Sequence, residues 1–190
     1  LANVRVIIPL WKDDAVLNNW AIRQDGPSAW RYANLGAHYV RRGMLPEARD
    51  AYLKLIELWP GHYFGWYALG SIYASLNQVE LAIDPLRRGL VLNPDNYMNR
   101  IRLAAMERSR ERPAAAIELL EEGVRRPQDP GFEPQFEGRM RLHLGLASLH
   151  IGRRDDAVRQ FSAARGLVHT PDDLAEVEQA LQSARAGNRK

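Results

Sequence analysis

The histidines are the side chains in this 190-residue sequence best suited to metal binding or proton transfer, and there are five of them. His143 and His150 are seven residues apart, so in a helix they lie on one face, two turns apart. Two histidines do not complete a metal site, and the sequence has no HExxH motif, phosphate-binding loop or Gly-x-Ser-x-Gly elbow. We therefore interpret them as surface or groove residues and predict no metal, no cofactor and no enzymatic activity.

Three pairs of aspartates are a second candidate for chemistry, because two neighbouring carboxyl groups can act as acid and base. Each pair, however, stands just before or within the first turn of a predicted helix, where negative charge complements the helix dipole. We interpret these aspartates as structural and name no catalytic residue. The pairs are Asp13-Asp14, Asp155-Asp156 and Asp172-Asp173.

Arginines are a third candidate, because guanidinium groups bind carboxylate or phosphate through paired hydrogen bonds. Glutamates including Glu107 and Glu111 are interleaved with them, which favours a solvated, ion-paired helix surface over an anion site. The 26 basic residues are nearly matched by 23 acidic ones, which argues against a nucleic-acid partner. The arginines are Arg100, Arg102, Arg108, Arg110, Arg112, Arg125, Arg126, Arg139, Arg141, Arg153 and Arg154.

The candidate residues lie on helices that a 34-residue repeat in the sequence predicts. Glycine, tyrosine, alanine and proline recur in phase, since Gly36, Tyr39, Ala48 and Pro60 are followed 34 residues later by Gly70, Tyr73, Ala82 and Pro94. Small residues allow two helices to approach closely, and proline stops a helix because it lacks an amide hydrogen. The repeat therefore predicts a series of helical hairpins, each of which needs its neighbours to bury its apolar face.

The spacing of large and small residues in this repeat resembles the tetratricopeptide repeat family. The second unit carries the pattern most completely, while the third has Arg100 and Glu107 at aromatic positions, and a fourth follows an insertion at 131–137. The resemblance implies an all-α, right-handed superhelical solenoid with hairpins at 29–62, 63–96, 97–130 and 138–171. The residues that carry it in the second unit are Trp66, Leu69, Gly70, Tyr73, Ala82, Leu86 and Pro94.

The apolar periodicity and the helix start and stop signals predict nine helices in these hairpins and after them. A capping helix is expected within residues 172–190, because it shows one apolar stripe and a polar back. The expected ranges are 28–42, 45–58, 62–76, 79–92, 95–109, 113–125, 135–151, 154–167 and 172–186.

Residues 1–27 do not fit the repeat, but an amphipathic stretch from Ala15 to Arg23 predicts an additional helix packed on the first hairpin. The sequence from Leu10 to Asp14, with Gly26-Pro27, resembles the junction in polytopic membrane glycosyltransferase-like proteins that end in a tetratricopeptide tail. That resemblance implies a missing upstream membrane span and a periplasmic or otherwise extracytoplasmic location. The alternative is an irregular helix in an ordinary, cytoplasmic repeat protein.

In the family that this chain resembles, the first helices of successive hairpins line a concave groove that binds partners. The corresponding residues are mostly apolar or aromatic with arginine at the rim, which favours a peptide or amphipathic helix. A carboxylate clamp is not expected, since Ala33 and Ala37 stand where it needs lysine and asparagine. The predicted contact residues are Trp30, Val40, Phe64, Tyr67, Met98, Ile101, Arg108, Arg139 and Leu142.

Two functions from different classes follow. The first is a protein-interaction scaffold, and the second is an accessory extracytoplasmic tail that positions an acceptor for a membrane glycosyltransferase. Against binding through the groove stands the alternative that Trp30, Phe64 and Tyr67 are covered by the N-terminal helix or packed between hairpins. Self-association also stays open, and the sequence identifies neither the partner nor the oligomeric state.

Overall fold

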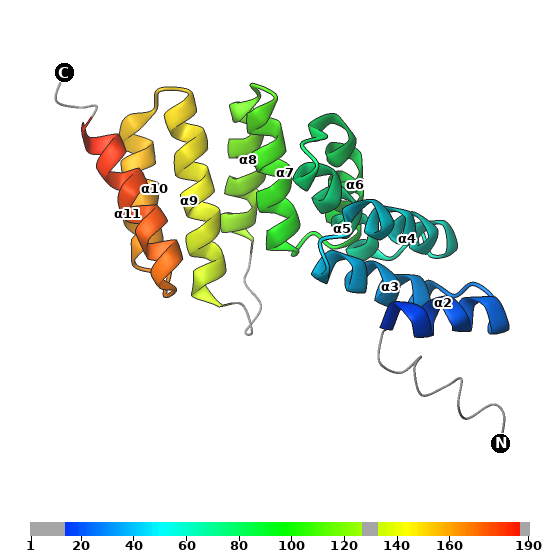
Figure 1. Ribbon diagram of the computed structural model, residues 1–190. Coiled ribbons are helices and arrows are strands. Elements are labelled where there is room, and N and C mark those ends of the chain that lie inside the picture. The colour runs from blue at the N-terminus through cyan, green and yellow to red at the C-terminus, as the bar shows by residue number, and fades with distance from the viewer. Residues whose placement is uncertain (1–13, 127–132, 187–190) are drawn as a thin grey trace. The chain divides into compact units, whose positions relative to one another are not determined.

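The computed structural model describes residues 14–126 and 133–186, and these residues form ten α-helices (Figure 1). Their bounds are α2 Asp14–Asp25, α3 Ala29–Arg41, α4 Leu45–Leu58, α5 Tyr63–Ser75, α6 Val79–Leu92, α7 Tyr97–Ser109, α8 Pro113–Arg125, α9 Pro134–His150, α10 Arg154–Arg165 and α11 Pro171–Ala186.

The helices predicted after residue 28 are confirmed, each within two residues at either end. The additional N-terminal helix is also confirmed as α2, and the capping helix as α11. Residues 134–137 of the predicted insertion form the first turn of α9. The parts of the predictions that fall on residues 1–13, 127–132 and 187–190 lie outside the described residues.

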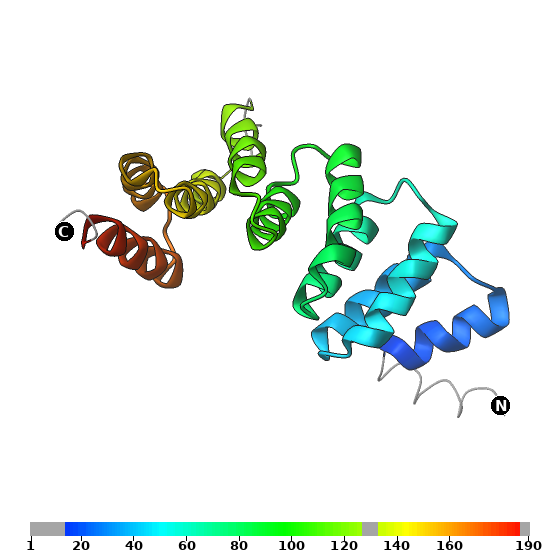
Figure 2. The same cartoon turned by 90° about the horizontal axis from the view of Figure 1, so that it is seen from above.

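The chain divides into two compact units, an N-terminal unit of residues 1–93 and a C-terminal unit of residues 94–190. In the N-terminal unit, α3 pairs with α4 and α5 with α6, while α2 packs on α3 (Figure 2). In the C-terminal unit, α7 pairs with α8 and α9 with α10, and α11 packs mainly on α10. Sequential helix pairs thus confirm the all-α hairpin fold.

Three hairpins close where a glycine of the first helix meets a large side chain of the second. A Cβ atom at Gly70 would lie 2.6 Å from Leu86 Cγ, and one at Gly145 would lie 2.4 Å from Phe161 Cε1. Gly36 meets the ring of Tyr52 in the same way, at 2.7 Å. Only glycine permits these approaches, so the glycines found in the sequence do close the hairpins.

The third hairpin is closed differently, by Arg100. This side chain is only 2% exposed, and its guanidinium donates hydrogen bonds to Leu119 O at 3.0 Å, to Pro94 O at 2.8 Å and to Glu122 Oε2 at 3.0 Å. Its stem lies over Gly123, where an added Cβ would be 2.5 Å from Arg100 Cδ. The prediction that Arg100 and Glu107 belong to a solvated surface is therefore wrong, because both are buried.

Each hairpin turns between its two helices at one residue with positive φ. The residue after it donates its amide to a carbonyl five residues back, as Met44 does to Tyr39 O at 2.9 Å, which closes the end of the first helix. The left-handed residues follow the repeat, since Asn77 comes 34 residues after Gly43 and Glu111 comes 34 after Asn77. They are Gly43 (φ 71°), Asn77 (φ 57°), Glu111 (φ 56°) and Gly152 (φ 76°).

The start of α11 is fixed by Thr170 and Asp173. The Asp173 amide donates to Thr170 Oγ1 at 3.1 Å, and the Thr170 hydroxyl donates to the Asp173 carboxylate at 2.7 Å. This confirms the structural interpretation of the Asp172-Asp173 pair. None of the described helices is long and apolar enough to cross a membrane.

Gly145→Ala tests the close approach of α9 and α10. We expect it to lower the free energy of unfolding by about 1–3 kcal/mol, because the new methyl group would overlap the buried Phe161 ring. Urea denaturation followed by circular dichroism measures the change. Gly166→Ala is the matched control, since its Cβ would meet only Ala163 O at 3.7 Å. Equal effects of the two substitutions would contradict the packing argument.

Arg100→Ala tests the buried arginine. It removes the hydrogen bonds to two backbone carbonyls and opens a cavity beside Gly123, so we expect a loss of about 3 kcal/mol in stability. Glu122→Gln keeps those bonds and changes a carboxylate that is half exposed, so its loss should be about 1 kcal/mol or less. Thermal and urea unfolding measure both. A Glu122→Gln loss as large as that of Arg100→Ala would show that the ion pair dominates instead.

Candidate binding surface

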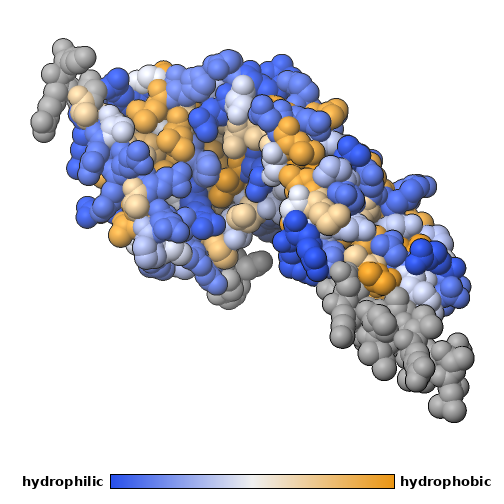
Figure 3. Space-filling view, in the orientation of Figure 1, coloured by the Kyte–Doolittle hydropathy of each residue, from blue (hydrophilic) through white to orange (hydrophobic). Residues whose placement is uncertain are grey.

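In the N-terminal unit, aromatic side chains remain exposed on the first helix of each hairpin. Trp30 on α3 is 70% exposed and Phe64 on α5 is 44% exposed, while Val40 is exposed and Tyr67 half-buried. The Phe64 and Tyr67 rings lie 5.8 Å apart between centroids. Apolar patches bordered by hydrophilic residues are visible in the space-filling view (Figure 3). These predicted contact residues are therefore accessible.

Local contacts at the start of α5 fix the positions of Phe64 and Tyr67. His62 Nδ1 accepts a hydrogen bond from the Gly65 amide at 3.0 Å and so caps the helix. The Trp66 indole donates to Pro60 O at 2.6 Å, and Phe64 meets the buried Tyr52 edge-on at 6.5 Å. The aromatic side chains thus project from a helix whose first turn is tied down.

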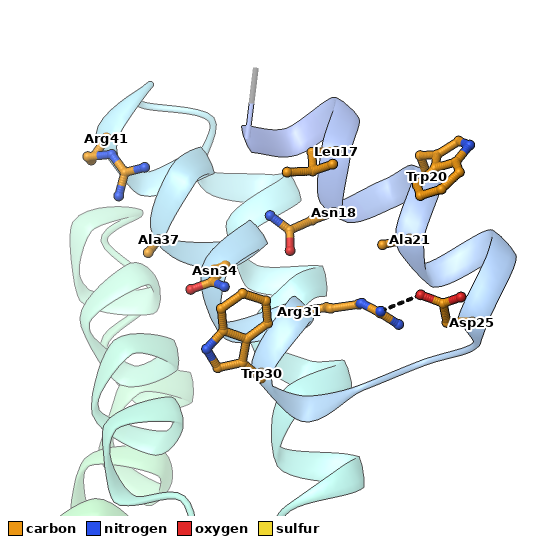
Figure 4. A pocket seen from close by; sticks show the side chains of 10 residues that line it. All are labelled: Leu17, Asn18, Trp20, Ala21, Asp25, Trp30, Arg31, Asn34, Ala37 and Arg41. Atoms are coloured by element: carbon orange, nitrogen blue, oxygen red, sulfur yellow. Dashed lines mark hydrogen bonds and ion pairs between the residues drawn. The ribbon is translucent and has the colours of Figure 1, made fainter. Parts of the chain in front are cut away.

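A pocket of about 520 Å³ lies between α2 and α3. Leu17 and Asn18 of α2 face Trp30 and Asn34 of α3 across it (Figure 4). On one side of the pocket, Arg31 forms an ion pair with Asp25 at 2.6 Å and donates a hydrogen bond to Gly26 O at 3.2 Å. The remaining lining residues are Trp20, Ala21, Ala37 and Arg41.

The packing of α2 also tests the alternative that the N-terminal helix covers the aromatic residues Trp30, Phe64 and Tyr67. Helix α2 packs on α3 but leaves the Trp30 side chain mostly in solvent, and Phe64 is exposed as well. For these two residues the alternative is therefore wrong. Sequence reasoning missed the pocket, because Asn18 and Trp20 belong to no repeat and only the packing of α2 brings them beside α3.

In the C-terminal unit, the predicted contact residues on α7 and α9 have mixed surroundings. Met98, Ile101 and Arg108 are partly exposed, and Ile101 also packs against the core formed by α7, α8 and α9. Leu142 is 2% exposed and packs in the core with Phe161 and Val177, so its prediction as a contact residue is wrong. Helix α9 contacts α7, α8, α10 and α11, which buries more of its faces than a repeat position predicts.

Arg139 is partly exposed and bound to the start of the last helix. Its guanidinium lies 3.0 Å from the Asp173 carboxylate. Burial works against ionisation of Asp173, but the hydrogen bonds from Thr170 and Arg139, with the charge of Arg139, outweigh burial and hold its pKa below the ordinary value. Arg139 therefore joins α9 to α11 in addition to facing solvent.

The two histidines of α9 differ in their surroundings. His150 lies at the end of the helix, and its Nε2 is 2.8 Å from the Glu111 carboxylate. His143 lines a narrow crevice with Arg108 and several alanines of α7, α8 and α9. Burial, together with the positive charges of Arg108 and Arg139, lowers the pKa of His143 from 6.5 to about 4. No cluster of histidine and carboxylate side chains in the described part of the chain could hold a metal ion.

Residues 33–97 match the tetratricopeptide repeat family. Two curated proteins match over 76 residues, or 40% of this chain: protein bimA of Emericella nidulans at 30% identity and Hsp70-Hsp90 organizing protein 1 of Glycine max at 32% identity. The match spans 9% of the first protein and 13% of the second, so this chain corresponds to a small part of each.

Solved structures with the same fold cover most of the chain. A crystal structure of MamA superposes with a TM-score of 0.70 at 26% identity, covering 78% of this chain and 83% of that one. A crystal structure of YrrB, described as a TPR protein with an unusual peptide-binding site, superposes with a TM-score of 0.74 at 20% identity, covering 95% and 88%. At 20% identity, the likeness to YrrB shows a shared fold alone.

His143→Gln tests the partly buried imidazole through the pH dependence of stability. Because the folded state holds the His143 pKa near 4 against 6.5, the unfolded chain binds more protons between these values. Stability should therefore fall by about 1–3 kcal/mol as pH decreases from 7 to 4.5, and the fall should be smaller in His143→Gln. Urea midpoints at each pH measure it. The exposed His169→Gln is the control, and an unchanged pH dependence in His143→Gln would contradict the assignment.

Proposed function

We propose that this chain, whose residues 33–97 match the tetratricopeptide repeat family, is a protein-interaction scaffold that binds a peptide or amphipathic helix on the first helices of its hairpins. One observation carries the finer part of the proposal, namely the exposed aromatic side chains on α3 and α5. Trp30 stands largely in solvent and Phe64 is almost half exposed, on helices whose other faces are buried in the core. Exposed aromatics of this kind supply most of the binding energy at protein interfaces.

The chemistry of this surface supports an apolar partner segment. Ala33 and Ala37 on α3 leave room between the large side chains, and Phe64 and Tyr67 provide a tilted aromatic pair on α5. An amphipathic helix or an extended hydrophobic segment buries such a surface well. Tetratricopeptide repeat domains are scaffolds that bind proteins, and residues 33–97 match that family.

A photo-reactive benzoyl-phenylalanine at position 64 tests the proposal. In the cells that make this protein, we expect it to crosslink a discrete partner, whereas the same group at Glu57, which is exposed on α4, should not. With the partner identified, Phe64→Ala and Tyr67→Ala should each weaken binding about tenfold in a calorimetric titration, a typical effect for an aromatic contact. Equal crosslinking from positions 57 and 64 would refute binding on this face.

The location of the protein stays a prediction. The resemblance to a membrane-protein junction includes residues 10–13, which lie outside the described residues. The extracytoplasmic tail and the role in positioning an acceptor rest on that resemblance, and self-association likewise stays a prediction.

A further inference from the structure

A crevice between α7 and α9 of the C-terminal unit places two nitrogen-bearing side chains together. Ala104, Ala105 and Ala147 are among the small residues that line it, and Arg108 and His143 are its polar members. The crevice is too narrow to admit even a water molecule. A ligand group would therefore lie at its edge, against Arg108 and His143, and not inside it.

The guanidinium of Arg108 is not engaged as those of Arg139 and Arg141 are. Within residues 14–126 and 133–186 its guanidinium makes no hydrogen bond or ion pair. By contrast, Arg139 binds Asp173 at 3.0 Å, and Arg141 binds Glu137 at 2.7 Å. The ion-paired surface predicted from the sequence thus holds for these two residues and does not extend to Arg108.

His143 adds a second unused donor beside Arg108. Its ring is partly buried and makes no hydrogen bond within the described part of the chain. The charged groups that act on it are Arg108 from α7 and Arg139 from its own helix, both positive. Of the carboxylates near these helices, Asp173 of α11 is engaged by Arg139 and Thr170, Glu111 lies against His150, and Glu107 of α7 is buried. An anion here would turn a repulsive arrangement into an attractive one.

We propose that Arg108 and His143 bind a carboxylate of the partner, so that the segment docking on the C-terminal unit is an acidic peptide. The guanidinium of Arg108 would donate paired hydrogen bonds to the carboxylate, and the imidazole of His143 would donate one more. This inference rests on the proposed scaffold function and adds the chemistry of the partner. It uses positions other than Ala33 and Ala37, where a carboxylate clamp was not expected.

Proton uptake is a consequence of this arrangement. The positive charges of Arg108 and Arg139 disfavour a protonated His143, and a bound carboxylate would offset them. Binding should therefore raise the pH at which the His143 ring protonates. A side chain that merely fills space in the core would show no such response.

The test uses the full chain and two capped eight-residue probes, one of glutamates and one of glutamines, at matched ionic strength. Nuclear magnetic resonance of the histidine rings should show a saturable shift of the His143 signal with the glutamate peptide at pH 6. The midpoint of His143 protonation should rise by at least one pH unit. Arg108→Gln should weaken binding of the glutamate peptide at least fivefold, while Arg153→Gln, an exposed arginine of the same unit, should not.

Three outcomes would overturn the proposal. They are an equal response to the glutamate and glutamine peptides, no saturable shift at His143, and equal weakening by Arg108→Gln and Arg153→Gln, which would indicate nonspecific charge attraction. The scaffold function fails separately, because crosslinking from position 64 reports on the N-terminal unit. Far-ultraviolet circular dichroism of Arg108→Gln verifies that the variant folds.

Discussion

Every hairpin of this protein depends on a close approach between its two helices, made possible by a glycine facing a large side chain. Gly70 with Leu86 and Gly145 with Phe161 set the approach to a distance at which a single methyl group would overlap the partner. The third hairpin reverses the arrangement, since Gly123 lies in the second helix and Arg100 in the first. These contacts determine which face of each helix is buried inside its hairpin. They therefore also determine which residues are left on the outer faces.

The two units carry different chemistry on the same scaffold. The first helices of the N-terminal unit present aromatic rings with few charges, whereas those of the C-terminal unit present Arg108, Arg139 and His143. Both units are built from helical hairpins, so the difference in surface chemistry lies in a few side chains that do not contribute to closing the hairpins. This separation is what allows a repeat fold to change its partner without losing stability.

The 34-residue period and the helix start and stop signals were sufficient to predict the helices, because each signal acts locally in the backbone. Burial of particular side chains was harder to predict. Arg100 and Glu107 resemble surface residues by type, and only the carbonyl groups that surround Arg100 explain its place in the core. The repeat position of Leu142 predicts a contact residue, but α9 is packed on more sides than that position implies. The pocket between α2 and α3 needed the packing of a helix that follows no repeat.

The turns between paired helices preserve the repeat in the backbone where the side chains have diverged. Gly43 and Gly152 adopt the left-handed conformation without strain, but Asn77 and Glu111 adopt it at a cost of about 1 kcal/mol each, since an L-amino acid crowds its own carbonyl there. Glu111 is the less suited of the two, because asparagine tolerates this conformation better than glutamate. The second and third hairpins are therefore less stable than they could be. Natural variation toward glycine at position 77 would remove this cost, whereas at position 111 it would also remove the contact of the Glu111 carboxylate with His150.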